Sequence, residues 1–208
     1  MSPTHLRRRG LAVALATATL AGGSATSATA APRAEKSPVP RPDFTLTLLH
    51  ANDQESALLP ITSEDGQVFA GAARFTQLLQ REERRFARRD PGPGQATRRG
   101  VLTVSAGDHF LPGPTLAASD DSGRPHYDAR AFSLADWDVA ILGNHDFDRG
   151  PDYLGAWFDD VTSDTPFVAG NLGFGQEPEL LAEVRDGTIV TSSVQHVEGE
   201  RIGIIGLT

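Results

Sequence analysis

The fold of this chain is decided by one stretch, DVAILGNHDFD at residues 138–148. Its first part is a short apolar run that predicts a buried β-strand over 138–142, and its second part is a polar loop that contains glycine. The same succession of strand and polar loop is expected after three other apolar runs, at 44–50, 101–105 and 167–169. The repetition indicates several similar strands in one sheet.

Segments with helical spacing of their apolar residues lie between these strands, at 71–89, 127–137 and 152–158. Two further apolar runs, 188–196 and 201–207, flank Glu198-Gly199-Glu200 and predict a β-hairpin. The alternation is typical of an α/β fold with a largely parallel sheet covered by helices. Ligands of such sheets gather at the carboxyl ends of the strands.

Three of the predicted strand ends carry an oxygen-bearing side chain: Asp53, Asp108 and Asn144. Each of them alone is explained as well by a turn or a helix cap. Their repetition at equivalent positions, with Glu55, His145 and Asp146 close by, favours a metal site instead. Oxygen ligands beside an imidazole suit Mn²⁺, Mg²⁺, Zn²⁺ or Fe, and two such ions would form a clamp for displacement at phosphorus.

The composition excludes several classes of protein. The chain has no Cys, so thiol catalysis, Cys-ligated zinc, iron–sulfur clusters and disulfide scaffolds are ruled out. The first thirty residues carry three of the 19 Lys and Arg and none of the 27 Asp and Glu, which leaves a net charge of −11 on the rest. An acidic domain is a poor match for a nucleic-acid polymer.

The N-terminus has the pattern of a signal peptide over residues 1–30. Three Arg at 7–9 precede an apolar stretch at 11–21 that is too short to span a bilayer, and Ala28-Thr29-Ala30 supplies a cleavage site. A membrane anchor is disfavoured because the stretch is rich in Ala and Thr and lacks a stop-transfer pattern. The pair Arg8-Arg9 leaves a twin-arginine signal open beside a general secretory one.

Export would deliver the mature chain to the periplasm, the cell wall or the medium, with no stable membrane span. Its first part, residues 31–42, contains four Pro and is expected to be an extended linker. The folded domain is expected to cover residues 43–208.

Three strings resemble the calcineurin-like metallophosphoesterases, most closely the exported 5′-nucleotidase branch: LLHANDQES, SAGDHFLPG and LGNHDFDRG. The resemblance covers roughly residues 43–208 and includes GAARFTQLL and IGIIGLT. It implies a four-layer αββα fold, a β-sandwich flanked by helices, of which this chain holds half. It also implies a dinuclear metal site and a small-molecule phosphoester substrate, with phosphate monoesters of nucleotides as the expected class.

By that resemblance Asp53 binds the first metal, Asp108 bridges both metals and Asn144 binds the second. His145 corresponds to the residue that faces the scissile phosphate, and Asp148 to the carboxylate that orients this histidine. A carboxylate partner favours the imidazolium form, which suits an electrostatic or general-acid role. A hydroxide between the ions would attack the phosphorus in line.

The sequence departs from the family pattern in two places. Glu55 stands where the first motif usually has His, so it is expected either to be a ligand that favours Mn²⁺ or Mg²⁺ over Zn²⁺, or to be a solvent-facing acid. The family also uses a lone His and a Gly-His-x-His pair further along, whereas His196 alone follows His145 here, and we expect it to be structural.

These departures predict an N-terminal part of the catalytic domain, truncated at its C-terminus and inactive alone. The alternative is a non-catalytic exported fragment that binds one metal weakly or none. A phosphodiesterase or a sulfur-ester hydrolase on the same metal core is also left open, because the fold does not choose the substrate.

The remaining predictions concern side chains outside the ligand set. We expect His50 to be a core or strand-end residue, His109 to point away from substrate and His126 to be exposed in a polar loop. The Arg-rich helix at 71–89 is expected to present a solvated, salt-bridged face. A split sandwich should leave the last strands with an uncovered face and an open edge.

Overall fold

The computed structural model describes residues 42–90, 92, 96, 98–122 and 126–208. The expected signal segment and all of the expected linker except Pro42 lie outside the described residues. Within the part that is described, no helix combines the length and the apolar character needed to cross a membrane.

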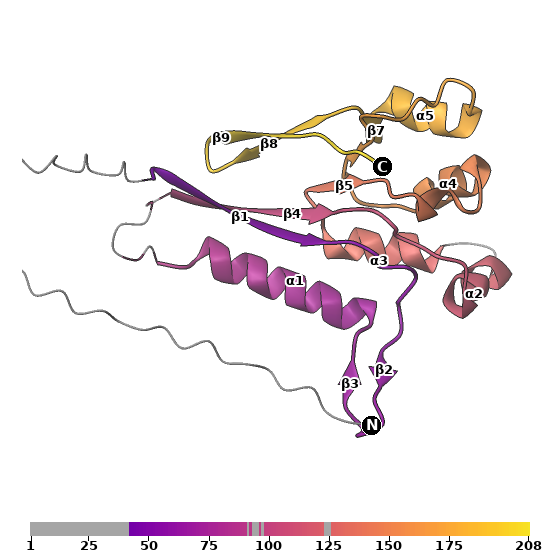
Figure 1. Cartoon of the computed structure of the whole chain (residues 1–208), viewed down its shortest axis with the longest axis horizontal. Coiled ribbons are helices and arrows are strands. Elements are labelled where there is room, and N and C mark those ends of the chain that lie inside the picture. The colour runs from indigo at the N-terminus through magenta and orange to yellow at the C-terminus, as the bar shows by residue number, and fades with distance from the viewer. Residues whose placement is uncertain (1–41, 91, 93–95, 97, 123–125) are drawn as a thin grey trace, which may run out of the picture. The chain divides into compact units, whose positions relative to one another are not determined.

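Five parallel strands form the central sheet, in the order β1-β4-β5-β6-β7 (Figure 1). Their bounds are Phe44–Ala51 for β1, Arg98–Ser105 for β4, Val139–Ile141 for β5, Phe167–Val168 for β6 and Ile189–Val190 for β7. The predicted parallel α/β sheet is therefore confirmed. The register pairs Ala51 with Ser105 and Ser105 with Ala140. The loops that follow β1, β4 and β5 therefore leave the sheet at the same edge.

Helices cover one face of this sheet. They are α1 (Ala72–Ala87), α2 (Pro114–Ser122), α3 (Tyr127–Ala135), α4 (Pro151–Phe158) and α5 (Pro178–Asp186). The core beneath them is strongly aromatic, and its buried rings include Phe132, Trp137, Trp157 and Phe167. Because successive strand residues point to opposite faces, Phe167 lies in this core while Val168 lies in the core of the other face.

The opposite face is covered by an antiparallel hairpin of β8 (Ser193–Val197) and β9 (Glu200–Ile204). Val197, Ile202 and Ile204 of the hairpin pack against Val104 and Val139 of the sheet. Figure 1 shows the hairpin on the other side of β1 and β4 from α1. One helical layer, one sheet and the hairpin make up the predicted half of a sandwich.

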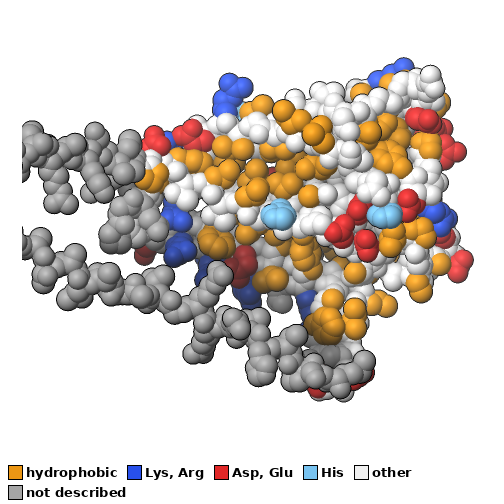
Figure 2. Space-filling model, in the orientation of Figure 1, with side chains coloured by type: hydrophobic (Ala, Val, Ile, Leu, Met, Phe, Trp, Pro, Cys, Tyr) orange, Lys and Arg blue, Asp and Glu red, His pale blue; other side chains and the backbone are white. Residues whose placement is uncertain are grey.

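The hairpin covers only part of its face. Phe44 and Leu46 of β1 contact the hairpin core, but Leu48 on the same side of the strand is 54% exposed. Ile205 and Leu207, just after β9, are 74% and 70% exposed, and Figure 2 shows hydrophobic side chains reaching the surface of the visible face. The expected uncovered apolar surface is present.

His50 shares this face and is exposed as the next-to-last residue of β1, so of the two positions expected for it the strand end is confirmed and the core is not. It follows Leu48 by two residues and therefore points to the same side of β1, beyond the part that the hairpin covers. The Arg-rich helix behaves as expected: in α1, Glu82 forms ion pairs with Arg81 and Arg85, and both arginines are well exposed.

Several short elements were not anticipated. These are α2, α5 and a small antiparallel pair of β2 (Ile61–Thr62) and β3 (Val68–Phe69). The apolar run at 188–196 also divides in two, because β7 joins the parallel sheet and β8 begins the hairpin. Helix α5 has Pro178 in its first turn and the left-handed Gly187 as its C-cap, which are local signals of a helix.

Candidate metal and catalytic site

The loops after β1, β4 and β5 are joined to one another by hydrogen bonds. The backbone N–H of Asp53 donates to the Gly107 carbonyl at 3.2 Å, and that of Glu55 donates to the Asp108 carbonyl at 3.0 Å. The N–H of His145 donates to Oδ1 of the Asp108 carboxylate at 3.0 Å. The loops that carry Asp53, Asp108 and Asn144 are therefore adjacent, as the carboxyl-edge rule requires.

The approach of the second and third loops depends on glycine. A Cβ added to Gly143 would lie 2.1 Å from Oδ1 of Asp108, and one added to Gly107 would lie 2.6 Å from the Gly143 nitrogen. Asp53, Glu55 and Asp108 themselves have positive φ, at 55°, 44° and 56°. Non-glycine residues in this strained region cluster at functional sites, and here they sit where the ligands are expected.

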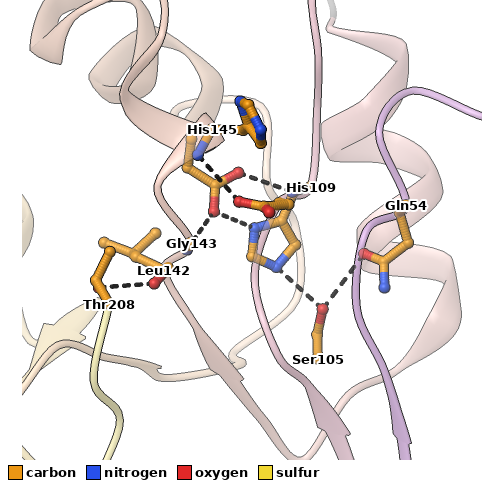
Figure 3. A network of polar contacts seen from close by, with 9 residues as sticks. Gln54, Ser105, His109, Leu142, Gly143, His145 and Thr208 are labelled. Carbon is orange, nitrogen blue, oxygen red and sulfur yellow. Dashed lines mark hydrogen bonds and ion pairs between the residues drawn. The ribbon is translucent and has the colours of Figure 1, made fainter.

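A buried network of hydrogen bonds links the three loops on their inner side (Figure 3). Both carboxylate oxygens of Asp146 are used: Oδ1 accepts from the His109 backbone N–H at 2.8 Å, and Oδ2 lies 2.9 Å from His109 Nδ1 and from the Gly143 nitrogen. On its other side His109 Nε2 contacts Ser105 Oγ at 3.0 Å, and Ser105 lies 3.3 Å from Gln54 Oε1. The network spans all three loops.

Asp146 is therefore not a metal ligand, contrary to its grouping with Asn144 and His145. It is fully buried, and burial alone would raise its pKa. The charge and hydrogen bond of His109, with the backbone N–H of Gly143 and of His109, outweigh burial and lower the pKa of Asp146. His109 points into the aromatic core and away from the exposed loop surface, as expected.

Ser105, His109 and Asp146 have the connectivity of a nucleophilic triad but not its accessibility. Ser105 and Asp146 are 0% exposed and His109 is 4% exposed. A nucleophile must reach its substrate, so this set is structural. His126 is also buried and bonded, with Nδ1 2.7 Å from Asp160 Oδ2, so the expectation of an exposed His126 was wrong.

His145 and Asp148 face the solvent on the same turn. His145 Nδ1 lies 2.8 Å from Asp148 Oδ2, and both side chains are more than one-third exposed. The hydrogen bond that His145 donates to Asp148, followed by the charges of Asp148, Asp108 and Glu55, raises the pKa of His145. A protonated imidazole with Nε2 directed elsewhere can donate to an anionic oxygen.

The donor chemistry fits a hard divalent cation, but the set does not converge. Asp53, Glu55 and Asn144 are exposed, Asp108 is half-buried and Asn52 donates to Asp53. Among the described residues, no three His, Asp or Glu side chains are gathered closely enough to hold a metal ion. Figure 2 shows acidic side chains grouped beside one of the exposed histidines. The loops thus place these oxygen-bearing side chains near one another at one edge of the sheet, without a closed set of ligands among the described residues.

Comparisons with known proteins agree with this geometry. No family model matches the sequence. The chain is 30% identical over 168 residues to a probable 5′-nucleotidase of Treponema pallidum, covering 79% of this chain and 25% of that protein. It is 28% identical over 172 residues to a 5′-nucleotidase of Diplobatis ommata, covering 79% and 26%.

A solved 5′-nucleotidase precursor from Thermus thermophilus superposes with a TM-score of 0.59 at 30% identity, covering 79% of this chain and 28% of that one. The chain resembles the N-terminal portion of 5′-nucleotidase-like metallophosphoesterases. It spans about a quarter of the length of these 5′-nucleotidase relatives. The NAD nucleotidase NadN of Haemophilus influenzae, at 22% identity and a TM-score of 0.56, supports the fold alone.

Proposed function

We propose that this chain belongs to an exported, metal-dependent phosphoesterase that hydrolyses phosphate monoesters of nucleotides. One observation carries the proposal: three hydrogen-bonded loops bring Asp53, Asp108 and Asn144 to one edge of the sheet, beside the His145–Asp148 pair. The 5′-nucleotidase names of the relatives support the substrate class, and the description of the Thermus thermophilus protein as a precursor supports export.

In this proposal Asp53, Asp108 and Asn144 hold divalent cations, and Glu55 is a further ligand from the first loop. A bound cation would supply positive charge for the phosphoryl oxygens and activate water. Asp148 orients the His145 ring through Nδ1, which leaves Nε2 to donate a proton or a hydrogen bond to a phosphate oxygen or to the leaving group. The raised pKa of His145 favours the protonated form of this donor.

Two ions need more ligands than the described loops provide. We propose that the missing ligands are imidazoles from a further segment of a longer catalytic domain, as the resemblance implies. The uncovered apolar face beside the hairpin supports this proposal, because a second sheet packed there would bury Leu48, Ile205 and Leu207. Reading the coding DNA beyond Thr208 tests it, with a lone His and then Gly-His-x-His as the expected continuation.

A non-catalytic module that binds one metal weakly is the second candidate. The observation that favours it is the lack of a convergent set of three His, Asp or Glu side chains among the described residues. Both candidates predict weak metal binding and no phosphate release for this chain alone. They predict different phosphate release only for a protein that also contains a downstream segment.

The test combines metal binding with phosphate release. For this chain alone we expect at most one weakly bound Mn²⁺ by electron paramagnetic resonance, reduced in Asp108→Asn and kept in the exposed control Asp164→Asn. We expect no phosphate release from an aryl phosphate with Mn²⁺, Mg²⁺ or Zn²⁺. Robust turnover by this chain would refute its predicted inactivity.

In the longer protein, metal-dependent release of phosphate from a nucleoside monophosphate should appear and should be lost in Asn144→Ala and His145→Ala. A folded longer protein that releases no phosphate with any of these metals would refute the phosphoesterase proposal and leave the binding module.

A further inference from the structure

A cavity of about 240 Å³ lies on the helical side of the sheet, between α1, α3 and the loop after β1. Figure 1 shows α1 and α3 on the same side of β1 and β4. Most of the cavity wall is apolar, and Phe75, Phe132 and Trp137 contribute aromatic rings to it. Of the proposed metal ligands, Asp53 alone lines this cavity.

Two side chains in the wall have polar atoms without a well-formed hydrogen bond in the described part of the chain. Asp128, in the first turn of α3, is 4% exposed, and its carboxylate oxygens have Ser56 only as a weak polar neighbour among the described residues. Gln54 places Oε1 near Ser105, as Figure 3 shows, while its Nε2 is buried and has no partner in the described part of the chain. Buried polar groups are normally satisfied, so each of these needs a partner from elsewhere.

The described residues around Asp128 do not pair with its charge. Ser56, which is in contact with Asp128, lies 3.4 Å through Oγ from the Leu111 carbonyl oxygen, to which it donates. Burial raises the pKa of Asp128, and the influence of Ser56 and of His126 only partly offsets this effect. His126 is itself paired with Asp160. A carboxylate held in an apolar wall without a partner is costly, and a cation placed beside it removes that cost.

We propose that this cavity binds a small organic amine in its protonated form. The ammonium group would pair with Asp128, and the apolar body would pack against Phe75, Phe132 and Trp137, whose ring faces also attract a cation. A cavity of about 150 Å³ holds benzene. The present volume therefore fits one ring with a short side chain.

The occupant would also touch the first loop of the proposed metal site, because Asn52, Asp53 and Gln54 line the same cavity. Binding would therefore order the loop that carries Asp53. The amine site itself does not depend on the phosphoesterase proposal, since its charged partner Asp128 has no role in that chemistry.

The probe is 2-phenylethylamine, titrated calorimetrically into the whole chain at neutral pH without added metal. We expect saturable binding of one molecule, with 2-phenylethanol, which has the same shape but no charge, binding at least about tenfold more weakly because a charge-assisted hydrogen bond is lost. Asp128→Asn should abolish the preference for the amine. The exposed control Asp164→Asn should keep it.

A second variant separates the cavity from the charge. Ala131→Leu fills the cavity from α3 while keeping Asp128 and should weaken both probes, whereas Ala118→Leu on the exposed side of α2 should change neither. The proposal is overturned if neither probe binds, if the alcohol binds as well as the amine, or if folded Asp128→Asn retains the preference for the amine. If the cavity holds only water, neither probe should bind.

Discussion

Replacing Asp146 tests whether the buried network sets the geometry of the three loops. Its carboxylate accepts from the His109 N–H at 2.8 Å and from His109 Nδ1 and the Gly143 N–H, both at 2.9 Å. Asparagine has the same shape but one acceptor atom. In either orientation of the amide, its NH₂ group would face at least one backbone N–H, so a buried donor would lose its acceptor.

The expected cost follows from these contacts. An unsatisfied buried donor costs about 1–3 kcal/mol, and each hydrogen bond to a charged group contributes about 1.5–3 kcal/mol. One unsatisfied donor and one lost hydrogen bond together amount to about 2.5–6 kcal/mol. This range contains the about 3–5 kcal/mol that is typical when one partner of a buried pair is removed. We therefore expect Asp146→Asn to lower the free energy of unfolding by about 3–5 kcal/mol, a large part of the roughly 5–15 kcal/mol of a whole domain.

Urea denaturation followed by tryptophan fluorescence measures this change, because the Trp157 ring lies 5.6 Å from the His109 ring. Asp164→Asn, an exposed carboxylate, should stay within about 0.5 kcal/mol of the parent. Asp146 has a lowered pKa, so its stabilisation is present above the unfolded pKa of about 3.9 and is lost as pH falls through the folded value. The difference in the free energy of unfolding between the parent and Asp146→Asn should therefore become smaller below about pH 4.

A gap of less than about 1 kcal/mol at pH 7 would refute the assignment of Asp146 as a structural anchor, since one lost acceptor alone accounts for that much. A difference in the free energy of unfolding that becomes larger in acid would refute the lowered pKa of Asp146.

Two further predictions concern the loop surface. In metal-free protein, NMR titration of His145 should give a pKa above its ordinary value of about 6.5. Asp148→Asn should bring this pKa down because the hydrogen bond that His145 donates to Asp148 is the largest cause of the rise; an unchanged pKa in the variant would contradict this cause. Gly143→Ala should destabilise the fold and disturb Mn²⁺ binding because the new Cβ would lie 2.1 Å from Asp108 Oδ1, whereas Gly173→Ala, with open space around it, should do neither; parent-like unfolding and Mn²⁺ spectra in Gly143→Ala would contradict the close approach.

The parts of the fold that could be predicted are those with long, regular patterns. Helix α1 has sixteen residues and β1 and β4 have eight each, so their apolar periodicity is readable from the sequence. The short strands β5 and β6 were predictable from apolar runs that end in a loop with glycine, whereas the two residues of β7 carry almost no period of their own. For this reason the run at 188–196 predicts a single strand of a hairpin, although the structure divides it between two sheets.

The loops of the candidate site were predictable, whereas the burial of His126, outside the site, was not. The rule that ligands gather at the carboxyl ends of strands places Asp53, Asp108 and Asn144 together, and the hydrogen bonds between the loops agree with it. The burial of His126 depends on Asp160, which is 34 residues away, and a pairing over that distance leaves no local signal. Polarity alone therefore misplaced this residue.

The neighbouring side chains of Asn144-His145-Asp146 point in different directions, and the local backbone geometry explains why. Residues His145–Phe147 form a 3₁₀ turn, and the flanking Asn144 and Asp148 also have right-handed helical angles. With three residues per turn, successive side chains are about 120° apart and residues i and i+3 lie on the same side. Asp148 therefore returns to His145 and orients it at the surface, while Asp146 turns inward to His109. One turn thus presents a solvent-facing histidine pair and anchors it to the core.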